Sequence, residues 1–134
     1  MHFEHIFPVE WVDTDALGIV HFSNYFRYFE KAECELLRKI GLSYDYINSQ
    51  GIAIPRVEAF CKYLKPLRFG DIVKVSLNIS EIGNKHLKYN FEIFAENRKE
   101  KVAEGYVVIV TIDMKTFKAV NIPPFIIEKL QKLA

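Results

Sequence analysis

The sequence contains few cysteines and almost no excess of charge. Its 134 residues include two cysteines, Cys34 and Cys61, and neither has a metal-ligand partner at C-x-x-C spacing. A disulfide scaffold is therefore excluded, and we expect both thiols to pack as small hydrophobic side chains. Lysine and arginine total 18 and aspartate and glutamate total 17, which gives a net charge of +1. This balance argues against a dedicated binder of nucleic acid or anionic membranes, because such proteins need a basic surplus.

Long apolar runs and the common motifs of metal and nucleotide sites are also missing. The N-terminal segment, MHFEHIFPVEW, carries acidic residues and no long apolar run. We expect neither a signal peptide nor a membrane span there, and we predict a cytoplasmic protein. The sequence has no G-x-S-x-G elbow, no H-E-x-x-H pair, no G-x-G-x-x-G and no P-loop. We therefore predict an activity that uses no metal and no cofactor.

The sequence does contain enough apolar residues for one domain, which we place at residues 1–134. Hydrophobic residues make up 50% of the chain and aromatic residues 14%. A chain of this length buries about 65–70% of its unfolded surface, so its core needs no disulfide or metal. The high aromatic content favours a sheet or a large packed interface.

Alternation of apolar and polar residues predicts one strand near the N-terminus and four later strands. In the first strand, Phe3, His5, Phe7, Val9 and Trp11 share one face. Turn signals separate the later strands. We place the later strands at 57–63, 73–79, 87–93 and 106–112.

A helical spacing replaces the alternation between Ser23 and Ile40. Apolar residues recur there at every third and fourth position, with Ser23 as a suitable N-cap and Gly41 as a suitable C′ residue. We expect this helix to lie deep against a large surface, because its apolar face is wide and aromatic. Two shorter helices are predicted at 44–49 and 125–133.

These elements predict an α+β fold, with one long helix packed on a mostly antiparallel sheet of five or six strands. The strand at 106–112 is apolar on both faces, which is typical of a strand covered on both sides. One helix cannot cover both faces of such a sheet. We therefore predict that a second copy of the chain covers the remaining face in a homo-oligomer.

The segment DTDALG, residues 13–18, carries the strongest chemical signal and admits three interpretations. A calcium loop is disfavoured because Leu17 and Asn24 occupy its fifth and twelfth ligand positions. A phosphotransfer aspartate is disfavoured because Leu17 also replaces the expected threonine and no parallel sheet is predicted. The third interpretation is a carboxylate that attacks directly or activates water, just ahead of a helix whose free N–H groups bind an oxyanion. On residue type alone, Asp13 and Asp15 could equally serve only to shape a turn.

The run from Val9 to Ala32, VEWVDTDALGIVHFSNYFRYFEKA, closely resembles the N-terminal motif of the hot-dog thioesterases. The similarity is to the 4-hydroxybenzoyl-CoA thioesterase type, which includes the Tol–Pal-linked acyl-CoA thioesterases. The run from Tyr63 to Asp71, YLKPLRFGD, is similar to a second signature of that family. The resemblance implies a long helix wrapped by a curved antiparallel sheet, in homodimers that usually pair into homotetramers.

The resemblance also implies roles for individual residues. The family's catalytic aspartate falls on Asp15, and its oxyanion-binding backbone N–H falls on Phe22. Gly18 matches the glycine that shapes the loop. Glu30 matches an acidic helix position that we interpret as structural, and His21 lies at a position that varies within the family. Asn24 and Tyr25 match the N-Y pair that opens the helix.

Coenzyme A contacts are implied for the turn formed by Asn84, Lys85 and His86, which is similar to the family's coenzyme A-contacting segment. Coenzyme A carries several phosphate charges, and a nearly neutral protein must meet them with local cations. The cations available for this purpose are Lys62, Lys65, Arg68, Lys85 and Lys88.

The predicted activity is hydrolysis of an acyl- or aroyl-CoA thioester to a carboxylic acid and free coenzyme A. Asp15 is the predicted nucleophile or general base, and the sequence does not choose between these roles. One alternative is a non-catalytic hot-dog module that binds acyl-CoA, although such a module would lack a working carboxylate. A second alternative is a hot-dog dehydratase, which needs a histidine paired with a carboxylate in a segment not visible here.

Overall fold

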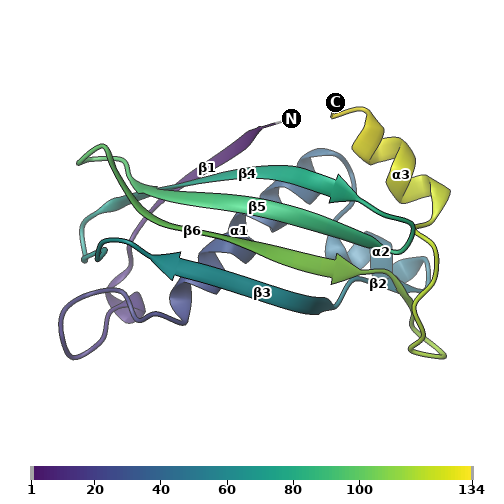
Figure 1. The fold of residues 1–134 in the computed structure, drawn as a ribbon, viewed down its shortest axis with the longest axis horizontal. Coiled ribbons are helices and arrows are strands. Elements are labelled where there is room, and N and C mark those ends of the chain that lie inside the picture. The colour runs from purple at the N-terminus through teal and green to yellow at the C-terminus, as the bar shows by residue number, and fades with distance from the viewer. Residues whose placement is uncertain (1, 134) are drawn as a thin grey trace.

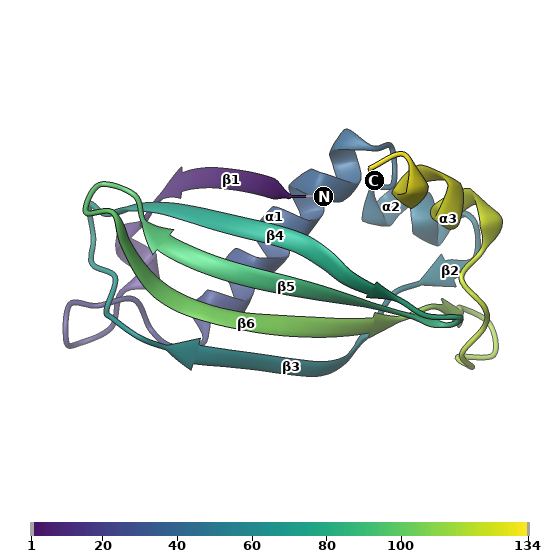
Figure 2. The same ribbon diagram turned by 45° about the horizontal axis from the view of Figure 1, so that its top comes forward.

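The computed structural model describes residues 2–133, in which an antiparallel sheet curves over one long helix (Figure 1). The five strands follow the spatial order β1-β4-β5-β6-β3. Figure 2 shows β1 and β3 at the two edges of this sheet. The strands are β1 (Phe3–Pro8), β3 (Arg56–Tyr63), β4 (Ile72–Ile82), β5 (His86–Ala95) and β6 (Glu100–Val110). The predicted fold class is therefore confirmed.

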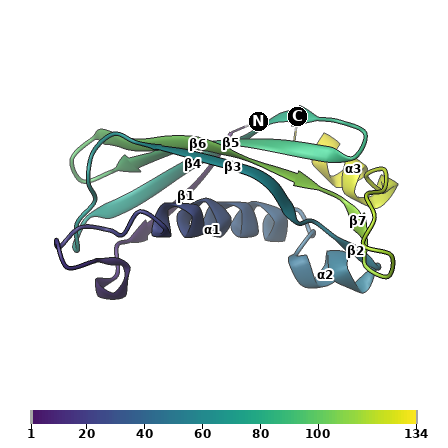
Figure 3. The same ribbon diagram turned by 60° about the horizontal axis from the view of Figure 1, so that its bottom comes forward.

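Three α-helices and two short strands complete the fold. The long helix α1 (Asn24–Lys39) lies under the concave face of the sheet, as Figure 3 shows. The remaining elements are η1 (Trp11–Asp13), α2 (Tyr44–Ser49), α3 (Pro124–Gln131), and the pair β2 (Ile52–Ala53) and β7 (Ile112–Asp113). Within residues 2–133, no helix combines the length and apolar character needed to cross a membrane.

The core lies between α1 and the concave face of the sheet. Phe29 of α1 stacks on Phe91 of β5 at a ring-centroid distance of 4.3 Å. Ala32, Leu36 and Leu37 continue the same face and are almost completely buried. Helix α1 ends where Gly41 adopts φ +79°, a backbone conformation that glycine reaches without strain.

The start of the chain departs from the predicted strand after Pro8, so Val9 and Trp11 lie outside β1. Trp11 does not extend the strand face of Phe3 and Phe7, because β1 ends at Pro8, which has no N–H for the ladder. The Val9 N–H donates to the Asp71 carbonyl at 2.9 Å, and the chain then turns into η1. Trp11 is consequently 73% exposed and packs edge-on against Phe69.

Residues 106–110 of the strand predicted at 106–112 form the second half of β6, between β5 and β3; β6 begins earlier, at Glu100, and Ile112 belongs to β7. Its inward residues Val107 and Ile109 are buried under α1, whereas the outward residues Tyr106, Val108 and Val110 are half-buried. The outer face is therefore not closed by the chain itself. Cys34 and Cys61 are free thiols and only half-buried, so the expectation that they pack inside the core holds in part.

Candidate active site

The loop between η1 and α1 is a tight turn that begins at Asp15. The Asp15 N–H donates to the Ile19 carbonyl at 2.9 Å, and the Gly18 N–H donates back to the Asp15 carbonyl at 2.9 Å. Gly18 has φ +79°, which explains why a glycine closes this turn. One carboxylate oxygen, Oδ1, accepts the Leu17 N–H at 2.8 Å, which fixes the direction of the side chain.

The two aspartates of the DTD motif have different surroundings. Asp13 is 4% exposed, and its carboxylate accepts hydrogen bonds from the Tyr28 hydroxyl, the Glu10 N–H and the Arg27 guanidinium. Asp15 is half-buried, and within residues 2–133 its second carboxylate oxygen, Oδ2, has no hydrogen-bond donor. Asp13 is thus engaged in holding η1 against α1, whereas Asp15 keeps an oxygen available for chemistry.

The backbone at the start of α1 leaves one N–H unused. Ser23 N–H donates to Nδ1 of His21 at 3.3 Å, and Asn24 N–H donates to the His21 carbonyl at 2.9 Å. The Phe22 N–H has no acceptor among residues 2–133. Ser23 stands at the predicted N-cap position but accepts no helix N–H, because its hydroxyl faces the His21 ring at 2.8 Å. His21 therefore organises the helix start.

A surface cleft of about 460 Å³ brings Asp15 and Phe22 together. Its walls come from the 15–22 loop, from α1 and from the end of β3 with the segment that follows. The lining residues are Asp15, Ile19, Val20, Phe22, Tyr25, Tyr63, Leu64, Lys65 and Pro66. The cleft is mostly apolar with a few convergent polar groups, which is the usual character of a small-molecule site.

Tyr63 was not among the predicted site residues, although it lines this cleft. Its hydroxyl donates to the Phe22 carbonyl at 2.9 Å, and its ring packs edge-on against Tyr25. Burial and the neighbouring Cys61 raise the pKa of Tyr63 to about 12, so the hydroxyl stays protonated as a donor. Only the fold places Tyr63 beside Phe22, because the two residues are far apart in the sequence.

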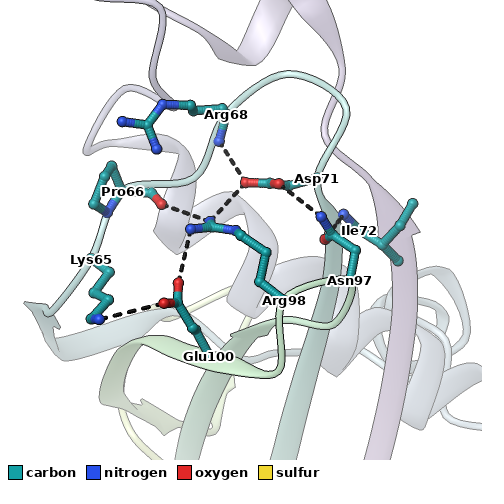
Figure 4. Close-up of polar contacts among 8 residues, drawn as sticks. All are labelled: Lys65, Pro66, Arg68, Asp71, Ile72, Asn97, Arg98 and Glu100. Atoms are coloured by element: carbon teal, nitrogen blue, oxygen red, sulfur yellow. Dashed lines mark hydrogen bonds and ion pairs between the residues drawn. The ribbon is translucent and has the colours of Figure 1, made fainter.

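An ion pair between the exposed Arg98 and the buried Asp71 links the segment beside the cleft to the turn after β5 (Figure 4). Arg98 donates to the Asp71 carboxylate at 2.8 Å and to the Pro66 carbonyl at 3.0 Å. Burial alone would raise the pKa of Asp71, but hydrogen bonds from the Arg68 N–H, Asn97 and Arg98 together hold it below its ordinary value. These contacts fix the segment between β3 and β4.

The fixed segment in turn holds the loop that carries Asp15. The Val20 N–H donates to the Leu67 carbonyl at 2.8 Å, and Ile19 forms an isolated bridge with Arg68. The second sequence signature, residues 63–71, therefore supports the loop that belongs to the first signature, residues 9–32. The cation nearest the cleft is Lys65, which lines it and also lies 3.4 Å from Glu100.

The structure does not bring the predicted coenzyme A residues to Asp15 within one chain. Asn84, Lys85 and His86 form the turn between β4 and β5, at the end of the sheet where α2 and α3 lie (Figure 1). Strand β5 has 10 residues and spans about 30 Å between this turn and the end near Lys65. His86 pairs there with Glu81 at 2.6 Å. A single chain therefore cannot form the whole predicted site.

This architecture belongs to a known protein family. The family model described as "Thioesterase-like superfamily" matches residues 9–130. The chain belongs to this superfamily. The predicted resemblance to the hot-dog thioesterases is thereby confirmed, and the chain is a thioester hydrolase.

Individual relatives are similar to this thioesterase in sequence and in structure. The crystal structure of a 1,4-dihydroxy-2-naphthoyl-CoA thioesterase from Synechocystis is 25% identical, with a TM-score of 0.92 and coverage of 99% of this chain and 98% of that one. A hypothetical protein from Aquifex aeolicus is 34% identical in its crystal structure, with a TM-score of 0.87 and coverage of 96% and 98%. The acyl-CoA thioester hydrolase YbgC of Escherichia coli is 26% identical over 92% of both chains.

Proposed function

We propose that this thioesterase hydrolyses an acyl- or aroyl-CoA thioester to a carboxylic acid and free coenzyme A. The observation that carries the proposal is the cleft in which the Asp15 carboxylate and the unused Phe22 N–H lie together. A free N–H at a helix start binds the oxyanion that develops on the thioester carbonyl. The carboxylate either attacks that carbonyl or removes a proton from the attacking water.

The cleft favours Asp15 over Asp13 as the catalytic group. Asp13 is buried among three donors, so using it in catalysis would require breaking the contacts that hold η1. Asp15 has one fixed and one available oxygen, which is the arrangement that an oriented nucleophile or base needs. The Tyr63 hydroxyl keeps Phe22 in place from the other side of the cleft.

The proposal includes a homo-oligomer, because one chain separates Asp15 from the turn at 84–86. Strand β3 leaves its outer edge unpaired within the described chain, and an open edge pairs readily with a second strand. Pairing β3 antiparallel with β3 of a second copy about Phe60 sets Glu58 of each copy opposite Lys62 of the other. The same two-fold pairing brings the 84–86 end of one copy toward the Asp15 end of the other.

In that assembly, coenzyme A extends from the cleft of one copy toward Asn84, Lys85 and His86 of the other. Lys65 at the cleft and Lys85 on the turn then supply cations for its phosphates. The proposal retains the cytoplasmic location predicted from the sequence. Neither alternative function is supported by a specific contact in the cleft.

A hydrolysis screen tests the proposed function. Acetyl-, butyryl-, long-chain and aromatic acyl-CoA esters are incubated with the protein, and release of the free coenzyme A thiol is followed with a thiol reagent. We expect turnover of at least one class. The absence of thiol release from every ester would favour the non-catalytic binding module.

A further inference from the structure

A hairpin at residues 113–118 follows β6 at the end of the sheet where α2 and α3 lie, and the proposed reaction assigns it no role (Figure 1). The Asp113 N–H donates to the Lys118 carbonyl at 3.0 Å, which closes the hairpin. The Oδ1 atom of Asp113 accepts the N–H groups of Lys115 at 2.8 Å and of Thr116 at 3.0 Å. These bonds give the hairpin tip one defined conformation.

Phe117, at this tip, adopts a backbone conformation that its residue type disfavours. Its φ is +61°, in the left-handed region that glycine and asparagine reach readily and a bulky side chain reaches only at a cost in free energy. The Phe117 N–H donates to the Asp113 carbonyl at 2.8 Å, which holds this conformation. The ring gains little packing in return, because Phe117 is 75% exposed. A strained aromatic residue with an exposed ring points to a contact outside its own chain.

Three exposed lysines accompany the ring. Lys115 and Lys118 flank Phe117 in the hairpin, and Lys85 lies on the turn to which the base of the hairpin is bonded. The Thr111 N–H donates to the Lys85 carbonyl at 3.0 Å. The hairpin begins two residues after Thr111, about 7 Å along the strand from that turn. One elongated ligand can therefore contact both the turn and the hairpin tip.

The charge and the exposed ring together select the class of ligand. None of the three lysines forms a direct ion pair among residues 2–133, and Asp113 attracts Lys115 only at longer range. A planar base that carries phosphate groups suits this surface, because bases stack on aromatic side chains and phosphates attract lysines. A protein partner suits it less, since a stable interface buries about 800 Å² on each side and the hairpin tip is much smaller.

We infer that Phe117 stacks on the adenine of coenzyme A, whose phosphates the three lysines attract. The inference rests on the proposed function, in which coenzyme A extends from the cleft of one copy toward the 84–86 turn of the other. The adenine then lies beyond that turn, on the hairpin of the same copy. Phe117 contributes to substrate binding and takes no part in breaking the thioester bond.

Calorimetry with the adenosine bisphosphate fragment of coenzyme A tests the inference without turnover. Phe117→Asn removes the ring but keeps a residue that tolerates the left-handed conformation. We expect this variant to bind the fragment about 5- to 50-fold more weakly, the effect of losing one stacked base. Phe117→Tyr keeps an aromatic ring and should bind within about twofold of the original chain. Absence of fragment binding, or equal binding by Phe117→Asn, would overturn the inference.

Stability and a matched control separate stacking from a structural role. Lys99 is also exposed and left-handed, with φ +55° in the turn between β5 and β6, at the other end of these strands. Lys99→Asn should relieve similar strain and leave fragment binding unchanged. Phe117→Asn should keep or raise the melting temperature, because asparagine fits this backbone. A lower melting temperature, or a changed oligomeric state in light scattering, would assign the ring to packing and overturn the inference.

Steady-state kinetics then place the effect on the substrate. Phe117→Asn should raise KM for a coenzyme A ester and leave kcat unchanged, because the stack is the same in the ground state and the transition state. KM for the matching pantetheine ester, which lacks adenine, should not change. Equal changes in KM for the two esters would contradict the inference. A chain that binds the fragment through Phe117 but hydrolyses no thioester would contradict the proposed function and support the stacking assignment.

Discussion

Replacing Asp13 by asparagine should weaken the fold much more than it slows the reaction. The Oδ2 atom of Asp13 accepts the Tyr28 hydroxyl at 2.8 Å and the Glu10 N–H at 3.1 Å, and Oδ1 accepts Arg27 at 3.2 Å. The Arg27 side chain is 60% exposed, so solvent screens that pair and its contribution is small. The two hydrogen bonds to Oδ2 therefore determine how much stability the substitution removes.

The size of the loss in the free energy of unfolding follows from replacing a charged hydrogen-bond acceptor with a neutral one. Hydrogen bonds to a charged group contribute about 1.5–3 kcal/mol and neutral ones about 0.5–1.5 kcal/mol. Asparagine can keep both bonds at its single carbonyl oxygen, but only at neutral strength. We expect Asp13→Asn to lower the free energy of unfolding by about 2–3 kcal/mol, and the melting temperature by roughly 6–15 °C.

Urea and thermal unfolding followed by circular dichroism measure this change. Thiol release by the folded variant should fall less than about tenfold, equivalent to less than about 1.4 kcal/mol in the barrier. Unchanged stability together with a hundredfold loss of kcat would refute the structural role of Asp13 and place it in the reaction.

Three further predictions concern assembly, acid stability and coenzyme A. Light scattering at micromolar concentration should show a dimer or tetramer, and a monomer of 15.7 kDa would contradict the proposed pairing. Because the folded-state pKa of Asp71 is below its ordinary value of 3.8, its contribution to stability is present above about pH 4 and is lost at lower pH. Asp71→Asn should therefore destabilise the protein most near neutral pH, and a loss that grows on acidification would contradict the ion pair with Arg98. Added salt should raise KM more for a coenzyme A ester than for the matching pantetheine ester, and equal effects would remove Lys85 from the site.

The secondary structure was largely predictable because the local signals were strong. The boundaries of α1 and α2 agree with the capping and turn residues around them, including Gly41. The prediction failed where a contact from a distant segment decided the conformation. Trp11 continues the alternation of β1, but Pro8 and the bond from Val9 to Asp71 end the strand first.

Only the part of the candidate site that contains Asp15 and Phe22 was predictable from the sequence. Asp15 and Phe22 are close in sequence, and one motif carries both of them. Tyr63 comes from a different strand, so no local pattern connects it with Phe22. No pattern in the sequence marks Glu33 of α1 as buried, and only the approach of Arg56 shows why a glutamate is buried there.

The most direct test of the account is the turnover of Asp15→Asn on the best substrate of the hydrolysis screen. Asparagine keeps the size and turn preference of aspartate but serves neither as a nucleophile nor as a base. We predict a fall in kcat of about 10²–10⁴ with little change in KM, in a protein whose circular dichroism and oligomeric state match those of the original chain. Full activity in Asp15→Asn would contradict the proposed mechanism.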